Sequence, residues 1–395
     1  MTAPESYHLD ANAWTRGRNL IGGLALAGIA AAASGWMSDP RQFYASYLVA
    51  YVYFVLVVLG GMFFVMLQHL TGSAWSVTMR RVMENVMVTV PVAAVLFVPV
   101  ALGVPTLYEW SHPEFRSEDP VMAVKMTFFN PAFYTARTVF YFVVWTVLAL
   151  TLYRSSVAQD GGGDIGSHRK ALWWSGPGLG ALMITVTMAS VDWLMSLEPH
   201  WYSTIFGVYV FSGGALAFVA ALTLTLLAFR RAGVLVKSVN VEHYHDLGKW
   251  MFALTVFWAY IAFSQYMLIW YANLPEETIW FKHRLEGNWA WVSGLLLFGR
   301  FILPFVVLLA RAPKRNLTVL GLISFWILAM QYVDLHWIVM PTVHEHGFHL
   351  HWLDLATFTA VGSLFAMAFW YRLRRRALVP IGDPRLKQAL HFKNV

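Results

Sequence analysis

Cysteine is absent from this sequence of 395 residues. Its absence excludes disulfide bonds, iron–sulfur clusters held by thiolates, CxxCH haem attachment and cysteine-based zinc sites. Charge is also scarce, because charged residues make up 12% of the chain and hydrophobic residues 58%. Soluble domains carry about 25% charged residues. The composition therefore excludes an ordinary soluble enzyme.

Apolar runs of about 20 residues, long enough to cross a bilayer as helices, recur along the chain. We expect ten such helices, at residues 17–36, 46–70, 84–103, 132–153, 171–197, 204–229, 249–272, 289–310, 317–340 and 353–371. A membrane β-barrel would show alternating strands, whereas the stretch 47–67 is apolar on every face. The expected fold class is therefore an all-α polytopic membrane protein.

The positive charges between these runs predict the orientation of the chain. With the N-terminus inside, the inner segments hold 21 of the 28 Lys and Arg residues and the outer loops hold five. Inner loops of membrane proteins are enriched in Lys and Arg, so we expect both termini to be cytoplasmic, in an inner (cell) membrane. The basic residues form short clusters between spans, which fits contact with membrane lipids and predicts no nucleic-acid partner.

Two pairs of spans resemble each other. Asp192 in the fifth span and Asp334 in the ninth each follow a valine and precede a proline by seven residues. The second and sixth spans each place a tyrosine shortly before a Gly-Gly pair. This repeat predicts two parallel four-helix bundles. We expect them at residues 46–203 and 204–352, between an N-terminal segment with the first helix (1–45) and a tenth helix with a basic cytoplasmic tail (353–395).

Charged side chains inside a bilayer are costly, so those within the spans are the candidate functional residues. Arg300 lies near the middle of the eighth span and needs an internal partner, for which Asp334 and Asp192 are the candidates. The two aspartates lie near the outer ends of their helices. Each is either a proton-handling carboxylate or a member of a structural ion pair.

A second polar group is expected at the inner ends of the second and third spans. His69 and Glu84 bracket a short loop there, so their side chains are candidates for a proton-conducting pair. With Asp192, Asp334, Arg300 and His336 toward the outer side, they would form two half-paths for protons. The alternative is that these are ordinary interfacial polar residues.

The last outer loop contains four histidines between residues 344 and 351. Imidazole binds zinc and copper, but the spacing is not that of HExxH, and we predict no metal site. Haem b needs histidines that face each other within the membrane, whereas His69 and His336 lie toward opposite faces. We therefore expect the chain to bind neither haem nor an iron–sulfur cluster.

Four segments, at residues 189–199, 257–266, 273–277 and 378–386, resemble a known family. They are similar to the ActF-type subunit of alternative complex III, a bacterial quinol-oxidising membrane complex, within the wider NrfD-like family. The resemblance extends from about the second span to the tail.

This resemblance implies two four-helix bundles and a set of partners: a sister NrfD-like subunit, a periplasmic iron–sulfur protein, c-type haem subunits and small membrane anchors. Quinol would be the substrate of the complex, and this chain would be a subunit without a redox centre. It also implies a role in proton translocation, which maps onto Asp192, Asp334, Arg300, His69 and Glu84. One alternative is a purely structural anchor for periplasmic redox subunits. A secondary transporter is less favoured, because prolines break the third span but not the seventh, its counterpart in the repeat.

Overall fold

The computed structural model describes residues 7–114, 124–161, 165–345 and 347–394. Within these ranges, ten helical stretches are long and apolar enough to cross a membrane, and no strand is present. This confirms the expected fold class, an all-α polytopic membrane protein. Eight spans are single helices: α1 (Ala11–Ser38), α2 (Pro40–Leu70), α9 (Pro131–Gln159), α10 (Ile165–Trp193), α11 (Phe206–Arg231), α12 (Val241–Ala272), α17 (Leu317–Val339) and α18 (Trp352–Leu373).

The third and eighth spans are interrupted. The third is divided into α3 (Val77–Met87), α4 (Val90–Leu96), α5 (Val98–Leu102) and α6 (Val104–Leu107). A proline lies in the first turn of each of the last three pieces. Proline has no N–H to donate and clashes with the preceding turn, so the helix ends and begins again at each one. The eighth span consists of α14 (Trp289–Leu295), the π-helix η3 (Leu296–Ile302) and α15 (Leu303–Leu309).

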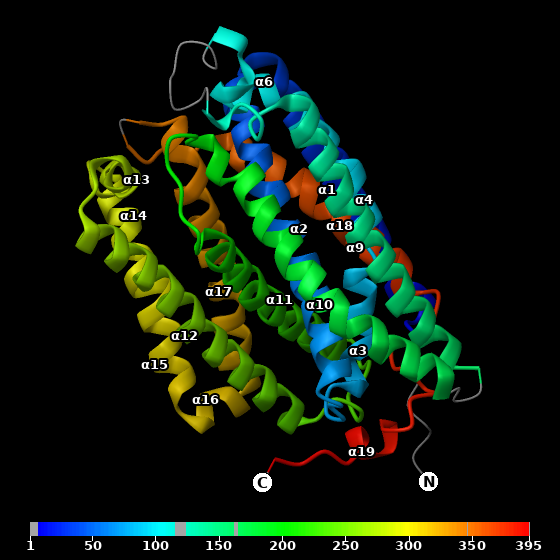
Figure 1. The fold of residues 1–395 in the computed structure, drawn as a ribbon. Coiled ribbons are helices and arrows are strands. Elements are labelled where there is room, and N and C mark those ends of the chain that lie inside the picture. Colours follow the sequence, from blue (N-terminus) through cyan, green and yellow to red (C-terminus); the bar gives the residue numbers. More distant parts are fainter. Residues whose placement is uncertain (1–6, 115–123, 162–164, 346, 395) are drawn as a thin grey trace.

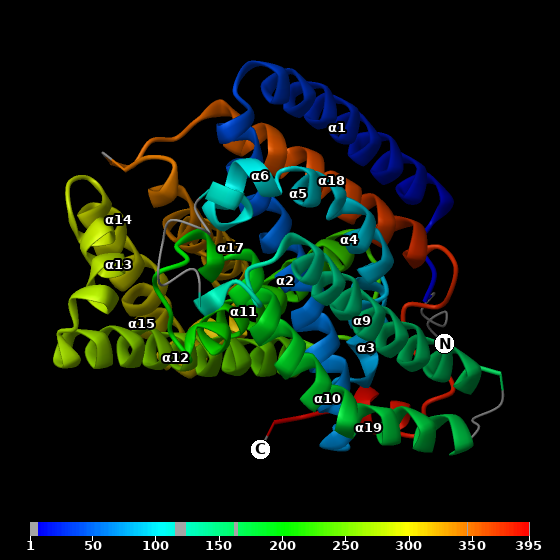
Figure 2. The same ribbon diagram turned by 45° about the horizontal axis from the view of Figure 1, so that its top comes forward.

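The spans pack as two bundles with a helix pair along one side. The third span, α9 and α10 group around α2, while α12, the eighth span and α17 group around α11. Helices α1 and α18 lie side by side at the edge of the first bundle (Figure 2).

Helices α2 and α11 cross at the centre of the molecule (Figure 1), where the paired glycines lie. A Cβ atom on Gly60 would stand 2.9 Å from the carbonyl oxygen of Gly214, and one on Gly214 would stand 2.9 Å from Cβ of Leu56. Real side chains do not fit at such distances. The glycines therefore allow the two backbones to touch, as small residues do in membrane helix pairs.

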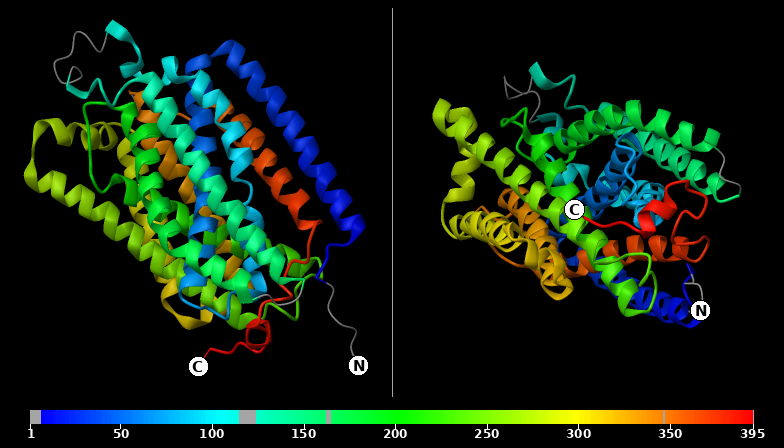
Figure 3. Two further views of the ribbon diagram at one scale, coloured as in Figure 1. Left: turned by 45° about the vertical axis from the view of Figure 1, so that its right-hand side comes forward. Right: turned by 90° about the horizontal axis from the view of Figure 1, so that it is seen from below.

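The beginning of α1 and the segment that follows α18 lie on the same side of the bundles (Figure 3). The C-terminal segment after α18, which includes α19 (Leu386–Leu390), runs across that side. The N–H of Leu378 donates to the carbonyl of Tyr7 at 2.8 Å, and Asn240 at the start of α12 donates to the carbonyl of Phe392 at 3.1 Å. The segment thus connects the beginning of the chain to the second bundle.

Candidate functional site

Arg300 occupies the middle of the π-helix η3, halfway through the eighth span. The side chain is 2% exposed, and its guanidinium donates to the carbonyl oxygen of Met330 at 2.9 Å and to Oε1 of Gln331 at 2.6 Å. Nη2 lies 3.3 Å from a carboxylate oxygen of Asp334. π-Helical turns are rare and occur frequently at functional sites. Of the two partners predicted for Arg300, the structure shows Asp334.

Asp334, on α17, is buried between a cation and a phenol. Its Oδ2 faces Arg300, and its Oδ1 accepts a hydrogen bond from the hydroxyl of Tyr209 on α11. Gly213, one turn further along α11, makes room for this arrangement, because a Cβ there would stand 2.7 Å from Nη2 of Arg300. Three helices of the second bundle therefore converge on one buried carboxylate.

Asp192, the other candidate partner of Arg300, pairs with a different arginine. Arg137 on α9 binds both of its carboxylate oxygens, with Nε at 3.0 Å and Nη2 at 2.7 Å. The hydroxyl of Tyr141 also donates to Asp192 at 2.7 Å. The sequence reveals Arg137 only as a charge within a span, since depth does not show which neighbouring helix a side chain faces.

The two bundles thus contain matching groups. In each one, an arginine from the third helix and a tyrosine hold an aspartate near the C-terminal end of the fourth helix. The tyrosines come from different helices, α9 in the first bundle and α11 in the second. Sequence reasoning found Asp192, Asp334 and Arg300 but gave no role to the two tyrosines, because tyrosine is common in apolar spans.

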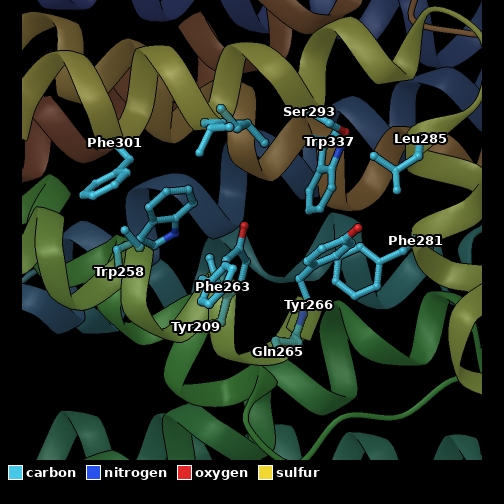
Figure 4. A pocket seen from close by; sticks show the side chains of 14 residues that line it. Tyr209, Trp258, Phe263, Gln265, Tyr266, Phe281, Leu285, Ser293, Phe301 and Trp337 are labelled. Carbon is cyan, nitrogen blue, oxygen red and sulfur yellow. Dashed lines mark hydrogen bonds between the residues drawn. The ribbon is translucent and has the colours of Figure 1, made fainter. Parts of the chain in front are cut away.

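An apolar pocket lies beside the Asp334 group, between α11, α12, the eighth span and α13 (Pro275–Leu285). Its volume is about 470 Å³. Figure 4 shows Trp258 and Phe301 at one end of the pocket, Trp337, Tyr266 and Phe281 at the other, and Tyr209 between them. Tyr209 therefore connects the pocket to the buried carboxylate.

His336 lies on α17 close to Asp334 in sequence, but it contacts a different helix. Its Nε2 is 3.6 Å from a carboxylate oxygen of Asp354 at the start of α18, and the imidazole is 1% exposed. Asp354 also accepts from the hydroxyl of Ser46 at 2.6 Å. Sequence reasoning missed Asp354, because it lies in the first turn of its span and reads as an interfacial residue.

Where α2 ends and α3 begins, the expected contact between His69 and Glu84 does not form. Glu84 lies between the guanidinium groups of Arg80, at 3.3 Å, and Arg81, at 3.0 Å. His69 is 2% exposed and has no hydrogen bond to any residue that the structure describes. Its nearest aromatic neighbour is the ring of His168, 6.4 Å away. Glu84 thus takes part in an arginine cluster, whereas His69 makes no hydrogen bond with that cluster.

That arginine cluster extends to other parts of the chain. Arg80 binds Asp383 in the C-terminal segment at 2.6 Å, and Arg81 binds Asp160 at the end of α9 at 2.9 Å. Burial alone would raise the pKa of Asp383, but the guanidinium of Arg80 outweighs it and holds that pKa below its usual value. The cluster therefore attaches the C-terminal segment to the first bundle.

The histidine loop between α17 and α18 places two pairs of rings near one another. The rings of His344 and His349 are 5.6 Å apart, and those of His349 and His351 are 6.4 Å apart, while residue 346 lies outside the described ranges. No group of three or more His, Asp or Glu side chains positioned to hold a metal occurs in the described parts of the chain. Burial and the neighbouring His349 lower the pKa of His344.

No protein-family model matches this sequence, and no curated protein sequence matches it.

Proposed function

We propose that this chain is a proton-handling membrane subunit of a quinol-oxidising complex, of the ActF-like type that its sequence resembles. The proposed partners are a sister NrfD-like subunit, a periplasmic iron–sulfur protein, c-type haem subunits and small membrane anchors. The proposed orientation has both termini in the cytoplasm of a bacterial cell, which places Asp334 toward the outer face.

The observation that supports this proposal best is the buried Asp334 between Arg300 and Tyr209. Ionisable groups within a membrane are costly and commonly mark ion or proton pathways. A tyrosine hydroxyl both donates and accepts hydrogen bonds, so a proton passes between it and a carboxylate without movement of the helices. The arrangement suits a carboxylate that gains and loses a proton.

The two aspartates differ in a way that assigns them different roles. Two guanidinium nitrogens of Arg137 bind the two carboxylate oxygens of Asp192, and the hydroxyl of Tyr141 donates a further hydrogen bond. This is the geometry of a strong, fixed ion pair. Asp334 has a single arginine nitrogen at 3.3 Å and a tyrosine that reaches the pocket. We therefore assign proton transfer to Asp334 and mainly a structural role to Asp192.

Two other functions are less well supported. A secondary transporter would show breaks at corresponding positions of its repeats. The third span is broken by prolines, but its counterpart α12 runs without a break from Val241 to Ala272. A subunit that only anchors its partners needs no buried carboxylate beside a pocket.

The test is proton release by the intact complex in proteoliposomes that are supplied with quinol and an electron acceptor. Asp334→Asn keeps the size of the side chain but cannot exchange a proton, so we expect fewer protons released per electron by the complex that assembles. Asp192→Asn should chiefly reduce assembly. Glu286→Gln removes a carboxylate that is 62% exposed and is the matched control, with an unchanged ratio. An unchanged ratio in assembled Asp334→Asn complex would reject the proposal in favour of an anchor.

A further inference from the structure

The pocket beside Asp334 opens onto the surface of the helix bundle that faces the membrane. Several side chains that line it are also substantially exposed on that surface: Phe263 is 61% exposed, Leu285 47% and Leu297 52%. They belong to α12, α13 and the eighth span. A molecule dissolved in the bilayer can therefore enter between these elements from the side.

The inner part of the pocket offers two uncharged polar groups. The hydroxyl of Tyr209 is bonded to Asp334, and the side chain of Gln265 is 3% exposed, with its Oε1 accepting from Ser203 at 3.1 Å. The amide nitrogen of Gln265 donates no hydrogen bond to another described residue, so it is available to a ligand. Both groups suit a hydroxyl or a carbonyl oxygen.

The remaining lining is aromatic and carries no charge. Rings surround the space on several sides, and no Lys, Arg, His, Asp or Glu lines it. A phospholipid headgroup needs a cation for its phosphate, but Arg300 lies behind the ring of Trp258, 4.4 Å from its centre, and is already paired. A flat, uncharged ring with hydroxyl groups and an aliphatic tail fits this lining better. The volume of about 470 Å³ is in the usual range of ligand pockets.

We propose that this pocket binds the ring of a membrane-soluble quinol, with one hydroxyl at Tyr209 and Gln265 and the tail leaving between α12 and the eighth span. The ligand class rests on the proposed function, and the site itself rests on the geometry above. A bound hydroxyl at this position is connected through Tyr209 to the carboxylate of Asp334. Binding and proton exchange are proposed for the pocket, and no electron transfer within it.

The test is photolabelling of the complex, purified with its partners into nanodiscs, by an azido-quinone with a short isoprenoid tail. We expect the label on peptides from α12 or α13, and we expect excess unlabelled quinol to remove it. Ala262→Trp fills the pocket and should abolish labelling. Gln265→Leu removes the free donor and should weaken binding by roughly three- to tenfold, the equivalent of one hydrogen bond. Leu322, on α17, has a side chain that is 67% exposed and does not line the pocket. Leu322→Trp therefore adds the same ring outside the pocket, and this variant should be labelled normally.

Labelling that is absent from α12 and α13, or that persists in Ala262→Trp, would overturn the site. Displacement by phosphatidylglycerol rather than by quinol would show a phospholipid site instead and would also overturn it. Failure of this inference is distinguishable from failure of the proposed function. Normal labelling together with an unchanged proton ratio in Asp334→Asn keeps the site and rejects the function, whereas a reduced ratio without labelling does the reverse.

Discussion

The ion pair between Arg300 and Asp334 allows a quantitative prediction. Arg300→Met removes a cation that is 2% exposed, together with its hydrogen bonds to Met330 and Gln331, and leaves a buried carboxylate with Tyr209 alone. Breaking a buried pair by removing one partner typically costs about 3–5 kcal/mol. We expect a loss of this size for Arg300→Met, and a similar one for Asp334→Asn.

The double variant should lose less than the sum of these two costs, because neither uncompensated charge remains. Residues in direct contact show coupling free energies of about 0.5–3 kcal/mol, and the burial of this pair places it toward the upper end, at about 2 kcal/mol. The measurement is the free energy of unfolding of the parent chain, both single variants and the double variant. Each is unfolded in mixed micelles in which the fraction of a denaturing detergent is raised stepwise.

An exposed pair in the same chain serves as the control. Lys282 and Glu286 are 69% and 62% exposed and lie 3.8 Å apart, so their coupling should stay below about 1 kcal/mol. Additive effects of Arg300→Met and Asp334→Asn, each below about 1 kcal/mol, would refute the reasoning that this pair is desolvated and mutually dependent.

Three further predictions concern other parts of the chain. Gly213→Ala should displace Arg300 and destabilise the protein, whereas Gly294→Ala, whose Cβ would meet nothing within 4 Å, should be tolerated in the same unfolding assay. Because the pKa of Asp383 is lowered, its contact with Arg80 should persist at neutral pH and be lost as the pH falls through that lowered value. The rate of hydrogen exchange in the C-terminal segment should therefore rise in acid. The variant Asp383→Asn should show this fast exchange already at neutral pH. The chain separated from its partners should show no Soret absorption, since the sequence has no cysteine for haem attachment and we expect no pair of span histidines to face each other.

The sequence predicts the ten spans well because apolar length is a strong and local signal. It does not reveal the breaks in the third span at their true places, although Pro91 and Pro99 indicate them, and it misses the π-helix around Arg300 entirely. A π-turn depends on how neighbouring helices pack against the span. Apart from Arg300, nothing in the residues 296–302 distinguishes this stretch from an ordinary apolar helix.

The partners of the buried charges were harder to predict than their depth. Arg80 and Arg81 read as surface charges that set the orientation, yet they are 1% and 0% exposed. They are buried because Glu84, Asp160 and Asp383 reach them from three separate parts of the chain. Such convergence depends on the rotation of each helix and on the path of the tail, and neither follows from a span-by-span reading of the sequence.

The glycine contact between α2 and α11 also limits how the protein can work. Where two backbones touch without side chains between them, one bundle cannot slide or tilt over the other without opening a void in the most tightly packed part of the molecule. The two halves therefore behave as one rigid body, unlike those of carriers that rock around a central substrate. Movement at the Asp334 site must then come from side chains, water and the interrupted eighth span, over distances of a single hydrogen bond.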